Sequence, residues 1–425
     1  MDKVKKVPEI RFDGFEKNNV YSINLGEVAE FKKGPFGSSL KKEMFVPKST
    51  DTVKVYEQQN AIESDHELSR YYITRQDYNN LSAFTVCPGD IIVSCAGTIG
   101  KTYELPSNAE KGIINQALMR IRVYPEKINK EFFKLKFSSL IIDLIEIYSN
   151  GSAIKNIPPL KDLKTKAIYC GDQAEQGQIG TFFKNLDEKL ELEKEKHEKL
   201  INFKKAMLED MFPKEGEKVP KARFEGFDDA WSSTTIDNIP GRINYCKGNG
   251  LTKDDLKKNK QYNPAILYGH IFTEYGSYLK EVKFSTIKKL NNCTYSEEGD
   301  LIIPASSTTA DNAIVKGLAV NKSEVIYGGD INIIRFNNEI TNVFLAYYLD
   351  NSCLKERMFK NVQGTTIYHL YLNNIKDVFV QIPSPEEQSL IGNFFKNLDE
   401  KIEISEKKIE KIENFKKAML DKMFV

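Results

Sequence analysis

Few residues of this sequence have the types and spacing that catalysis or metal binding requires. The segment Cys95–Thr102 ends like a phosphate-binding loop, but Cys95 stands where that loop needs its leading glycine, so we do not expect nucleotide binding there. The six cysteines and four histidines are scattered, which predicts neither disulfides nor a zinc site. No histidine lies beside a recognisable nucleophile motif. We therefore expect no catalytic, cofactor-binding or metal-binding residues in this chain.

Several polar segments instead have the composition that contact with DNA requires. Residues 31–42 combine four lysines with glycines and hydroxyls, which suits phosphate groups. Amide, guanidinium and aromatic side chains at 58–60 and 70–72 suit base edges, and a comparable set occurs from 242 to 270. Each of these residues is also compatible with an ordinary solvated turn. The candidate DNA-binding residues are Lys32, Lys33, Ser38, Ser39, Lys41, Gln58, Gln59, Asn60, Arg70, Tyr71, Arg75, Arg242, Tyr245, Lys247, Asn249, Tyr268 and His270.

The overall composition is that of a soluble globular protein. Hydrophobic residues make up 40% and charged residues 28%, and no apolar stretch reaches the roughly eighteen residues of a membrane span. The N-terminus lacks the features of a secretory signal, so we expect a cytoplasmic protein with no membrane association. Lys and Arg number 61 against 60 Asp and Glu, so any DNA-binding face is local. Only nine arginines are present, and Arg70, Arg75 and Arg242 are the first candidates for bidentate contact with guanine.

The elements that position these loops belong to a long internal repeat. Residues 179–212 reappear as residues 391–424 at an offset of 212, with 23 of 34 positions identical. The same offset carries the arm Pro8–Phe15 onto Pro220–Phe227, whereas the segments between arm and helix barely match. We infer two tandem copies of arm, variable domain and helix, in which the helices act alike and the variable domains act on different things.

Each copy ends in a long amphipathic helix. Its apolar residues recur at a spacing of three and four, with charged residues between them, which is typical of a short coiled coil. Thirty-four residues would form a rod of roughly 51 Å, too long for one compact domain to cover, so we expect the two helices to pair antiparallel. A helical hairpin that merely joins two domains is the alternative. The residues expected to pair are Phe183, Leu186, Leu190, Leu200, Met207, Phe395, Leu398, Ile402, Ile409, Ile412 and Met419.

The variable domains have the pattern of a mixed α/β (α+β) fold. Strand-like runs occur at 53–56, 90–94, 118–123 and 331–336. Helices are expected at 130–148 and 342–360, followed by Gly151 and Gly364 respectively. The predicted organisation is an N-terminal arm (1–20), a first variable domain (21–166), a repeat helix (175–212), a linker with the second arm (213–232), a second variable domain (233–376) and a C-terminal repeat helix (387–425).

These repeated motifs resemble the specificity subunit of type I restriction–modification systems. The likeness rests on the Ile-Gly-x-Phe-Phe-Lys-Asn-Leu-Asp-Glu-Lys helix that ends Phe-Lys-Lys-Ala-Met-Leu-x-x-Met-Phe, on the Arg-Phe-x-Gly-Phe arm, and on Glu-Gln before each helix. It implies two target recognition domains, each reading one half of a bipartite, asymmetric sequence in double-stranded DNA, while the paired helices set the unread spacer. One departure is that residues 172–175 lack the prolines present at Pro383 and Pro385.

The same resemblance implies partner subunits that carry the chemistry. Two modification subunits would bring S-adenosylmethionine and methylate adenine, and restriction subunits would bring ATP- and Mg-dependent translocation and cleavage. Two other functions are open to the residues themselves. One is a self-contained methyltransferase or nuclease, against which the failed motifs argue. The other is a coiled-coil scaffold with two domains that bind something other than DNA.

Overall fold

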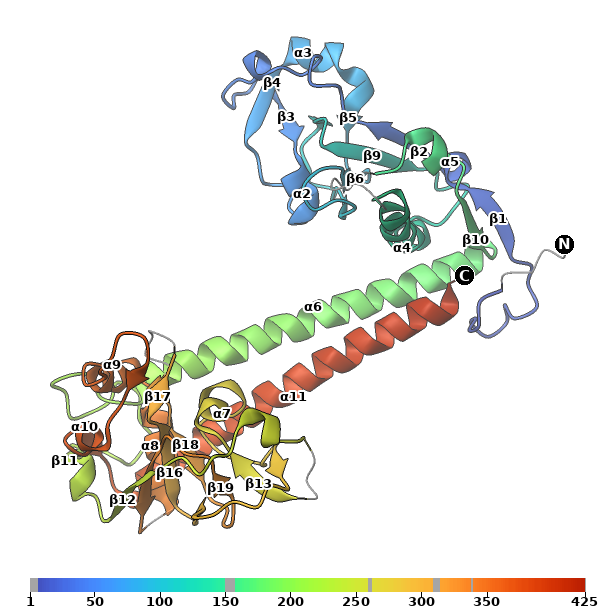
Figure 1. The fold of residues 1–425 in the computed structure, drawn as a ribbon. Coiled ribbons are helices and arrows are strands. Elements are labelled where there is room, and N and C mark those ends of the chain that lie inside the picture. Colours follow the sequence, from blue (N-terminus) through green and yellow to red (C-terminus); the bar gives the residue numbers. More distant parts are fainter. Residues whose placement is uncertain (1–6, 150–156, 259–261, 309–313, 338, 425) are drawn as a thin grey trace. The chain divides into compact units, whose positions relative to one another are not determined.

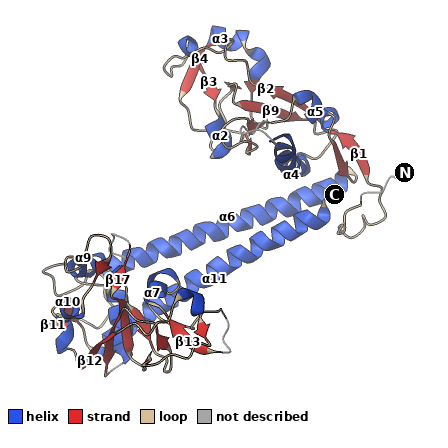
Figure 2. Ribbon diagram, viewed as in Figure 1, coloured by secondary structure: helices blue, strands red, loops and turns tan. Residues whose placement is uncertain are grey.

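The computed structural model describes residues 7–149, 157–258, 262–308, 314–337 and 339–424 (Figure 1). The chain divides into two compact units. The first consists of Met1–Glu191 with Glu410–Val425, and the second of Leu192–Ile409. Each unit is a mixture of helices and strands, as Figure 2 shows, so the predicted fold class is confirmed. The units are described one at a time.

Two four-stranded sheets form the body of the first unit. The central sheet is antiparallel, with the order β2-β9-β6-β7, and the second sheet has the order β4-β3-β8-β5 with β3 and β8 parallel. The predicted strands at 53–56, 90–94 and 118–123 are β3, β6 and β9. The bounds are β2 (Ala29–Lys33), β9 (Leu118–Val123), β6 (Ile91–Ser94), β7 (Thr102–Glu104), β4 (Tyr71–Thr74), β3 (Thr52–Tyr56), β8 (Gly112–Ile114) and β5 (Thr85–Val86).

The second unit repeats this topology strand for strand. Its central sheet has the order β12-β20-β16-β18, and its second sheet the order β14-β13-β19-β15 with β13 and β19 parallel. The duplication therefore extends through the domains whose sequences barely match. The bounds are β12 (Gly241–Cys246), β20 (Ile331–Phe336), β16 (Asp300–Pro304), β18 (Leu318–Val320), β14 (Ser285–Thr286), β13 (Asn263–Ile266), β19 (Ile326–Tyr327) and β15 (Thr294–Tyr295).

Short elements complete both units in corresponding places. In each, a strand that follows the arm pairs antiparallel with the strand that precedes the long helix: β1 (Tyr21–Asn24) with β10 (Ala167–Cys170), and β11 (Ser232–Thr235) with β22 (Phe379–Ile382). A further pair, β17 (Ser306–Ser307) with β21 (Tyr368–His369), occurs in the second unit. The short helices are α1 (Leu25–Val28), α2 (Gln58–Ile62), α3 (Arg75–Asn80), α5 (Leu160–Lys164), α7 (Tyr268–Thr273) and α10 (Leu372–Lys376).

The helix expected at 130–148 is present as α4 (Lys130–Ser149), but the one expected at 342–360 is not continuous. It is two helices, α8 (Glu339–Tyr348) and α9 (Ser352–Phe359), because the Asn351 side chain accepts hydrogen bonds from the amides of Cys353 and Leu354 and so starts a new helix. Gly364 lies five residues after the end of α9, with φ +118°, and Gly151 lies outside the described residues.

The two long helices are α6 (Gln173–Asp210) and α11 (Pro385–Met423). In the first unit Lys416 of α11 forms an ion pair with Asp187 of α6. In the second unit Lys204 pairs with Asp399 at 2.5 Å, and Lys408 with Glu193. Residue numbers rise along one helix as they fall along the other, so the helices are antiparallel, as predicted.

The residues expected to pair are withdrawn from solvent, but many of them also pack on the domains. Phe183 belongs to the core of the first unit, and Phe395 and Leu398 belong to that of the second. Leu186 and Met419 pack against the first core, and Met207 against the second. Leu190 and Ile412 are also buried, while Leu200, Ile402 and Ile409 are half-buried. The ends of the long helices are therefore parts of the domain cores.

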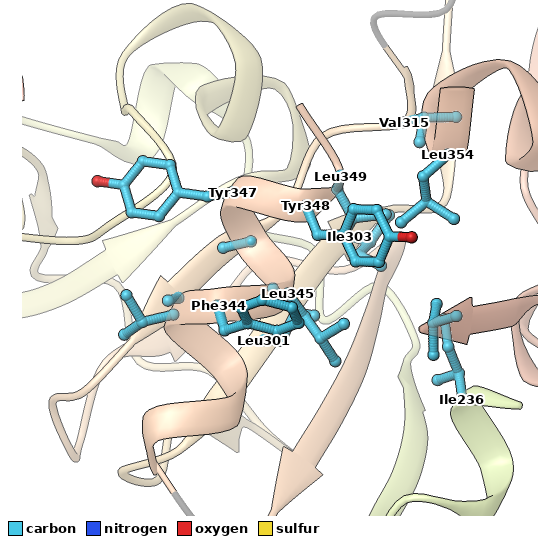
Figure 3. Close-up of a cluster of buried hydrophobic side chains, with 14 of the residues drawn as sticks. Ile236, Leu301, Ile303, Val315, Phe344, Leu345, Tyr347, Tyr348, Leu349 and Leu354 are labelled. Carbon is cyan, nitrogen blue, oxygen red and sulfur yellow. The ribbon is translucent and has the colours of Figure 1, made fainter. Parts of the chain in front are cut away.

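Matching aromatic clusters join helices to domains in the two units. In the first, the ring of Phe424 lies 5.7 Å from those of both Phe132 and Phe183. In the second, Phe212 lies 5.6 Å from Phe344 and 5.9 Å from Phe395. Each cluster uses the start of one repeat helix and the end of the other copy's repeat. Figure 3 shows the second core, where Phe344 and Tyr348 of α8 lie with Leu301 and Ile303 of β16.

Candidate DNA interface

Three loops of the first unit meet at one end of its central sheet. Strand β2 ends at Lys33, β6 ends at Ser94, and β9 begins at Leu118. The amide of Gly34 donates to the carbonyl of Leu118 at 2.9 Å, and that of Cys95 donates to Ala117 at 2.7 Å. A Cβ on Gly34 would lie 1.8 Å from the carbonyl oxygen of Asn115, so only glycine permits this approach. We call the meeting point of these loops the loop end of the sheet.

The loop end of the second unit is built in the same way. Strand β12 ends at Cys246, β16 ends at Pro304, and β20 begins at Ile331. The amide of Ala305 donates to the carbonyl of Asp330 at 2.8 Å. Gly329, with φ +105°, lies so close to Gly248 that a Cβ on it would be 2.4 Å from the Gly248 Cα. Close main-chain packing therefore fixes both loop ends.

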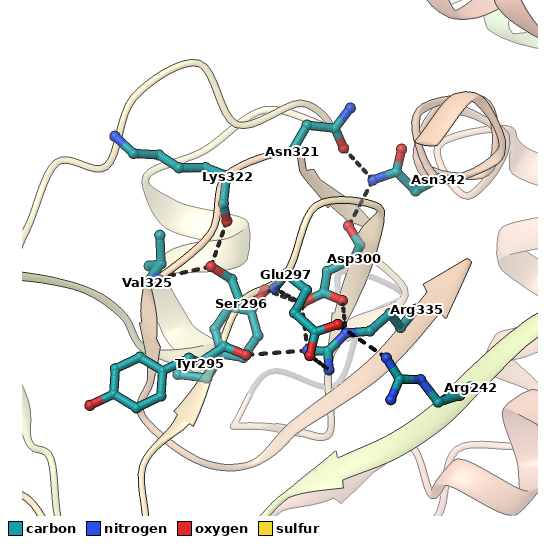
Figure 4. A network of polar contacts seen from close by, with 11 residues as sticks. Arg242, Tyr295, Ser296, Glu297, Asp300, Asn321, Lys322, Val325, Arg335 and Asn342 are labelled. Carbon is teal, nitrogen blue, oxygen red and sulfur yellow. Dashed lines mark hydrogen bonds and ion pairs between the residues drawn. The ribbon is translucent and has the colours of Figure 1, made fainter. Parts of the chain in front are cut away.

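A buried carboxylate braces each central sheet and gives the two copies a common register. The echo noted at Gly89-Asp90 and Gly299-Asp300 is structural: Asp90 binds Arg122 through bonds of 2.8 and 2.7 Å. Asp300 binds Arg335 through bonds of 2.6 and 3.1 Å (Figure 4). Both carboxylates also accept an amide of the preceding turn. Arg122 and Arg335 are thus held by buried carboxylates, and their hydrogen bonds to Asp90 and Asp300 raise the pKa of both guanidinium groups.

Counting from these arginines places the candidate residues of the two copies on equivalent sites. Met119 and Asn332 each lie three residues before the bracing arginine, and their partners across the sheet are Lys33 and Tyr245 respectively. Lys33 and Tyr245 therefore occupy the same position in two domains. Their different side chains suit different contacts.

The short helices α2 and α7 correspond in the same way. Each follows a strand that pairs in parallel with its neighbour. In each helix, the side chain of the third residue accepts a hydrogen bond from the main-chain amide three residues earlier. In α2 the Asn60 Oδ1 accepts the amide of Glu57 at 2.8 Å, and in α7 the His270 Nδ1 accepts that of Leu267 at 3.4 Å. The segments 58–60 and 268–270, selected separately from the sequence, are thus structural counterparts.

Three candidate residues have hydrogen-bond partners within the fold. Asn60 is buried, and its amide group donates to the carbonyls of Asp65 and Leu68. His270 is buried, stacks on Phe284 at 4.2 Å, and has a pKa lowered by that burial. Asn249 is half-buried and donates to the carbonyl of Tyr327 at 3.0 Å. Polar side chains that cap turns have the same composition as polar side chains that read DNA, so sequence could not separate them.

Two of the three arginines expected to grip guanine, Arg75 and Arg242, do not lie at the loop ends. Arg242 is at the opposite end of β12, beside the bracing Arg335, and forms an exposed ion pair with Glu297 at 3.1 Å. Arg75 begins α3 at the second sheet, 3.7 Å from Asp51. Arg70 lies 4.9 Å from the ring of Tyr71, which stacks on Phe45. Arg70 and Arg75 flank β4 at its opposite ends, and Tyr71, next to Arg70, pairs with Val55 of β3 close to the start of α2.

The remaining candidates are available to a ligand at or near the loop ends. Gln58 reaches the loop after β6, where its Nε2 would lie 3.4 Å from a Cβ on Gly97. Lys32 is half-buried on β2 with its Nζ 5.0 Å from the ring of Phe84, and Tyr268 is half-buried on α7. Phe36, at 86% exposure, projects from the same loop as Ser38. The exposed candidates are Lys33, Ser38, Ser39, Lys41, Gln59, Tyr245 and Lys247.

Two hollows at the second loop end include residues that the sequence did not single out. One, of about 410 Å³, is lined by Tyr245 together with Ser306, Asn332, His369 and Tyr371. The Oγ of Ser306 lies 3.2 Å from the Nδ1 of His369, and the Tyr245 hydroxyl donates to Asp330 at 2.6 Å. Burial and this bond raise the pKa of Tyr245 to about 12, so the hydroxyl stays protonated. No sequence signal linked these residues, because they come from four separate segments.

The second hollow, of about 900 Å³, is lined by Asp330 itself. Tyr268 lines it together with Lys253 and Lys258, and five glycines leave its main chain accessible. Among the described residues, no three His, Cys, Asp or Glu side chains gather as metal ligands would. No helix in the described ranges is long and apolar enough to cross a membrane. The loop ends offer amides, hydroxyls, aromatic rings and lysines, which is the chemistry of nucleic-acid contact.

Comparisons with known proteins bear on both copies. The family described as Type I restriction modification DNA specificity domain matches residues 17–202 and again residues 201–414. The specificity subunit of type I restriction enzyme MjaVIII from Methanocaldococcus jannaschii is 22% identical over 321 residues, which cover 73% of each chain. The S subunit of a type I restriction–modification system from M. genitalium matches 99% of both chains, with a TM-score of 0.56 and 17% identity. At that identity, the solved structure supports the fold alone.

Proposed function

Because the chain belongs to the family of type I restriction–modification DNA specificity domains, we propose that it is the non-catalytic subunit that selects the DNA sequence for such a complex. The observation that carries this proposal is the pair of family-matched domains with one topology and different side chains at equivalent loop-end positions. Each domain reads one half of a bipartite, asymmetric target. Lys33 and Gln58 serve one half, and Tyr245 and Tyr268 serve the other.

The long helices determine the length of the unread spacer. They hold the two recognition domains at a set spacing along double-stranded DNA, so that the bases between the half-sites remain unread. Inserting one heptad into both helices lengthens the unread spacer in this proposal, and an unchanged spacer would contradict it. Single-molecule methylation mapping of a strain that carries the insertion measures the spacer directly.

The partners are two identical modification subunits, and a row of phenylalanine rings that occurs once in each unit is their docking surface. In the first unit the rings of Phe12, Phe182 and Phe415 form a row with centroid distances of 5.7 and 6.2 Å. Phe224, Phe394 and Phe203 form the equivalent row in the second unit, at 6.0 and 6.2 Å. The last ring of each row is exposed, Phe415 at 47% and Phe203 at 46%. Equal apolar surfaces suit two copies of one partner.

The paired variants Phe203→Ser and Phe415→Ser test this docking. Each should remove one modification subunit from the complex, and the double variant should remove both, as native mass spectrometry would show. Retention of two subunits by the double variant would exclude these rows as docking surfaces.

The modification subunits bring S-adenosylmethionine, and restriction subunits bring ATP-dependent translocation and cleavage with Mg. The assembled complex acts on DNA in the cytoplasm.

A methylation map of genomic DNA tests the function as a whole. The source strain is compared with a strain that lacks only this chain, and one bipartite adenine-methylated motif with a fixed gap should disappear. Strains carrying Lys33→Ala or Tyr245→Ala should each relax one half of that motif. If no mark changes while the partner subunits are expressed, the alternative of a coiled-coil scaffold with two domains that bind something other than DNA is favoured.

A further inference from the structure

The junction between arm and long helix is the most closely repeated part of the two units. Arg11 binds both oxygens of Glu175, with bonds of 2.7 and 2.6 Å, and Arg223 binds both oxygens of Glu387, with bonds of 2.7 and 2.9 Å. The glutamine that follows each glutamate is buried. Because these groups match at the offset of 212, the first junction serves as an internal reference for the second.

In the first junction, the remaining polar atoms of the arginine and the glutamine all have partners. In the first unit the Nη1 of Arg11 donates to the main-chain carbonyl of Asn18 at 2.7 Å. The Oε1 of Gln176 accepts the main-chain amide of Asn129 at 2.9 Å, and its Nε2 donates to the carbonyl of Gly171. One main-chain carbonyl and one main-chain amide thus satisfy the arginine and the glutamine.

In the second unit the corresponding atoms have no partner within the described structure. The Nε2 of Gln388 donates to the carbonyl of Pro383 at 2.9 Å, but its Oε1 is buried and unpaired. The Nη1 of Arg223 is likewise buried and unpaired, although the rest of its guanidinium is bound. Trp231, which is 2% exposed, adds an unpaired indole Nε1. Buried polar groups left unpaired cost about 1–3 kcal/mol each, so three in one place call for a ligand.

Local sequence differences explain why the reference contacts are missing. Four residues lie between Phe15 and Val20 in the first arm, but only three lie between Phe227 and Trp231, the residue that precedes the equivalent strand. The shorter arm withdraws the carbonyl that Arg11 uses. Thr341, the counterpart of Asn129, lies inside the first turn of α8 instead of before it, and its amide does not bond to Gln388. The Arg–Glu pair and the buried glutamine are thus common to both junctions, while the groups around them differ.

The three residues line a pocket of about 650 Å³ in the second unit. Its walls include Pro383 and Pro385, which have no equivalent before α6. Its rim carries the exposed carboxylates of Asp228 and Asp229, where the first copy has Glu16 and Lys17. Two adjacent acids repel phosphate and attract a basic side chain, which disfavours DNA as the occupant.

We propose that this pocket receives a peptide segment of a partner subunit, whose main-chain carbonyl and amide replace those of Asn18 and Asn129, and whose basic side chain meets Asp228 and Asp229. The inference rests on the proposed function, because it needs the partner subunits of a restriction–modification complex. It adds that the complex is asymmetric: the first junction is closed by the chain itself, and the second is closed by the partner.

Trp231 is the only tryptophan in the chain, so it reports on the pocket without interference. The full-length chain is labelled with 5-fluorotryptophan, and its fluorine NMR spectrum is recorded alone and after assembly with unlabelled modification subunits. The single resonance should shift on assembly and stay in place when duplex DNA is then added. A shift that needs DNA, or one that follows the concentration of the chain alone, would identify a nucleic acid or a second copy as the occupant and overturn the proposal.

Binding of the same subunits to variants provides a second readout. Asp228→Asn with Asp229→Asn alters only exposed residues and should weaken assembly about tenfold, while Trp231→Phe removes one donor and should have a similar effect. Glu16→Gln on the rim of the first junction is the matched control and should change affinity less than twofold. Assembly at full affinity with an unmoved resonance would refute the pocket alone. A chain that binds no modification subunit and directs no methylated motif would refute the proposed function as well.

Discussion

In each unit, the buried ion pair of the central sheet and the aromatic cluster at the long helices form a frame for the loop end. The side chains of the frame are alike in the two units, whereas those of the loop ends differ. The braces Asp90–Arg122 and Asp300–Arg335 and the clusters around Phe424 and Phe212 correspond residue by residue. At the loop ends, Lys33 faces Met119 where Tyr245 faces Asn332. These few buried contacts are common to two domains of one topology whose sequences barely match. The surface that they carry is then free to acquire a different specificity in each copy.

Removing an aromatic residue from the frame of each unit should have the largest effect on stability, and that effect should be equal in the two units. Phe183→Ala and Phe395→Ala each leave a cavity in a fully buried cluster and should lower the free energy of unfolding of the affected unit by about 3–5 kcal/mol. Hydrogen exchange, resolved by unit, measures both losses. Phe36→Ala, at an exposed position, is the control and should change stability by less than about 0.5 kcal/mol. A large loss in one unit only would show that the frames are not equivalent.

Removing the charge of the bracing carboxylate should destabilise the second unit more than the first. Asp300→Asn removes the buried one of the two carboxylates that bind Arg335, whose side chain is 12% exposed, and should cost about 3–4 kcal/mol. Asp90→Asn should cost about 1–2 kcal/mol, because Arg122 is 40% exposed and water can solvate it. Urea unfolding of the two variants gives the comparison. Equal losses would contradict the role assigned to burial.

Substitutions at equivalent loop-end positions should separate the two specificities. In the assembled complex, Lys33→Ala and Tyr245→Ala should each reduce discrimination in a different half-site by about 1–3 kcal/mol, roughly ten- to a hundredfold. Competition binding with duplexes altered in one half at a time measures this. Both positions are exposed, so melting temperature serves as the control for folding. If both variants relaxed the same half, the assignment of one domain to each half would fail.

The smallest effect concerns phosphate contact. Lys41 is exposed in the loop after β2, and Lys41→Ala should lower the slope of log K against log salt by about 0.9 without changing the preferred sequence. Lys205, which is exposed on α6, provides a matched control. A changed sequence preference in Lys41→Ala would indicate a base contact instead.

The sequence predicted the frame better than the site. The repeat and the periodicity of the helices predicted α6 and α11, and alternating β-branched residues predicted β3, β6, β9 and β20, because these patterns are local. The site depends on turns and on distant segments. Asn60 and His270 carry the right functional groups, but their bonds face inward. The hollow that joins Tyr245 to Asn332 and His369 exists only after the chain has folded.

The order in which the chain leaves the ribosome has an unusual consequence for its folding. The second unit is one continuous segment, whereas the first needs Met419, Leu420, Met423 and Phe424 to complete its core. Although domains usually fold in the order of their synthesis, the domain made first here is finished last. Until residue 424 has been synthesised, Phe132 and Phe183 lack the ring of Phe424. A premature stop close to the C-terminus would therefore harm the N-terminal domain and spare the one beside it in sequence.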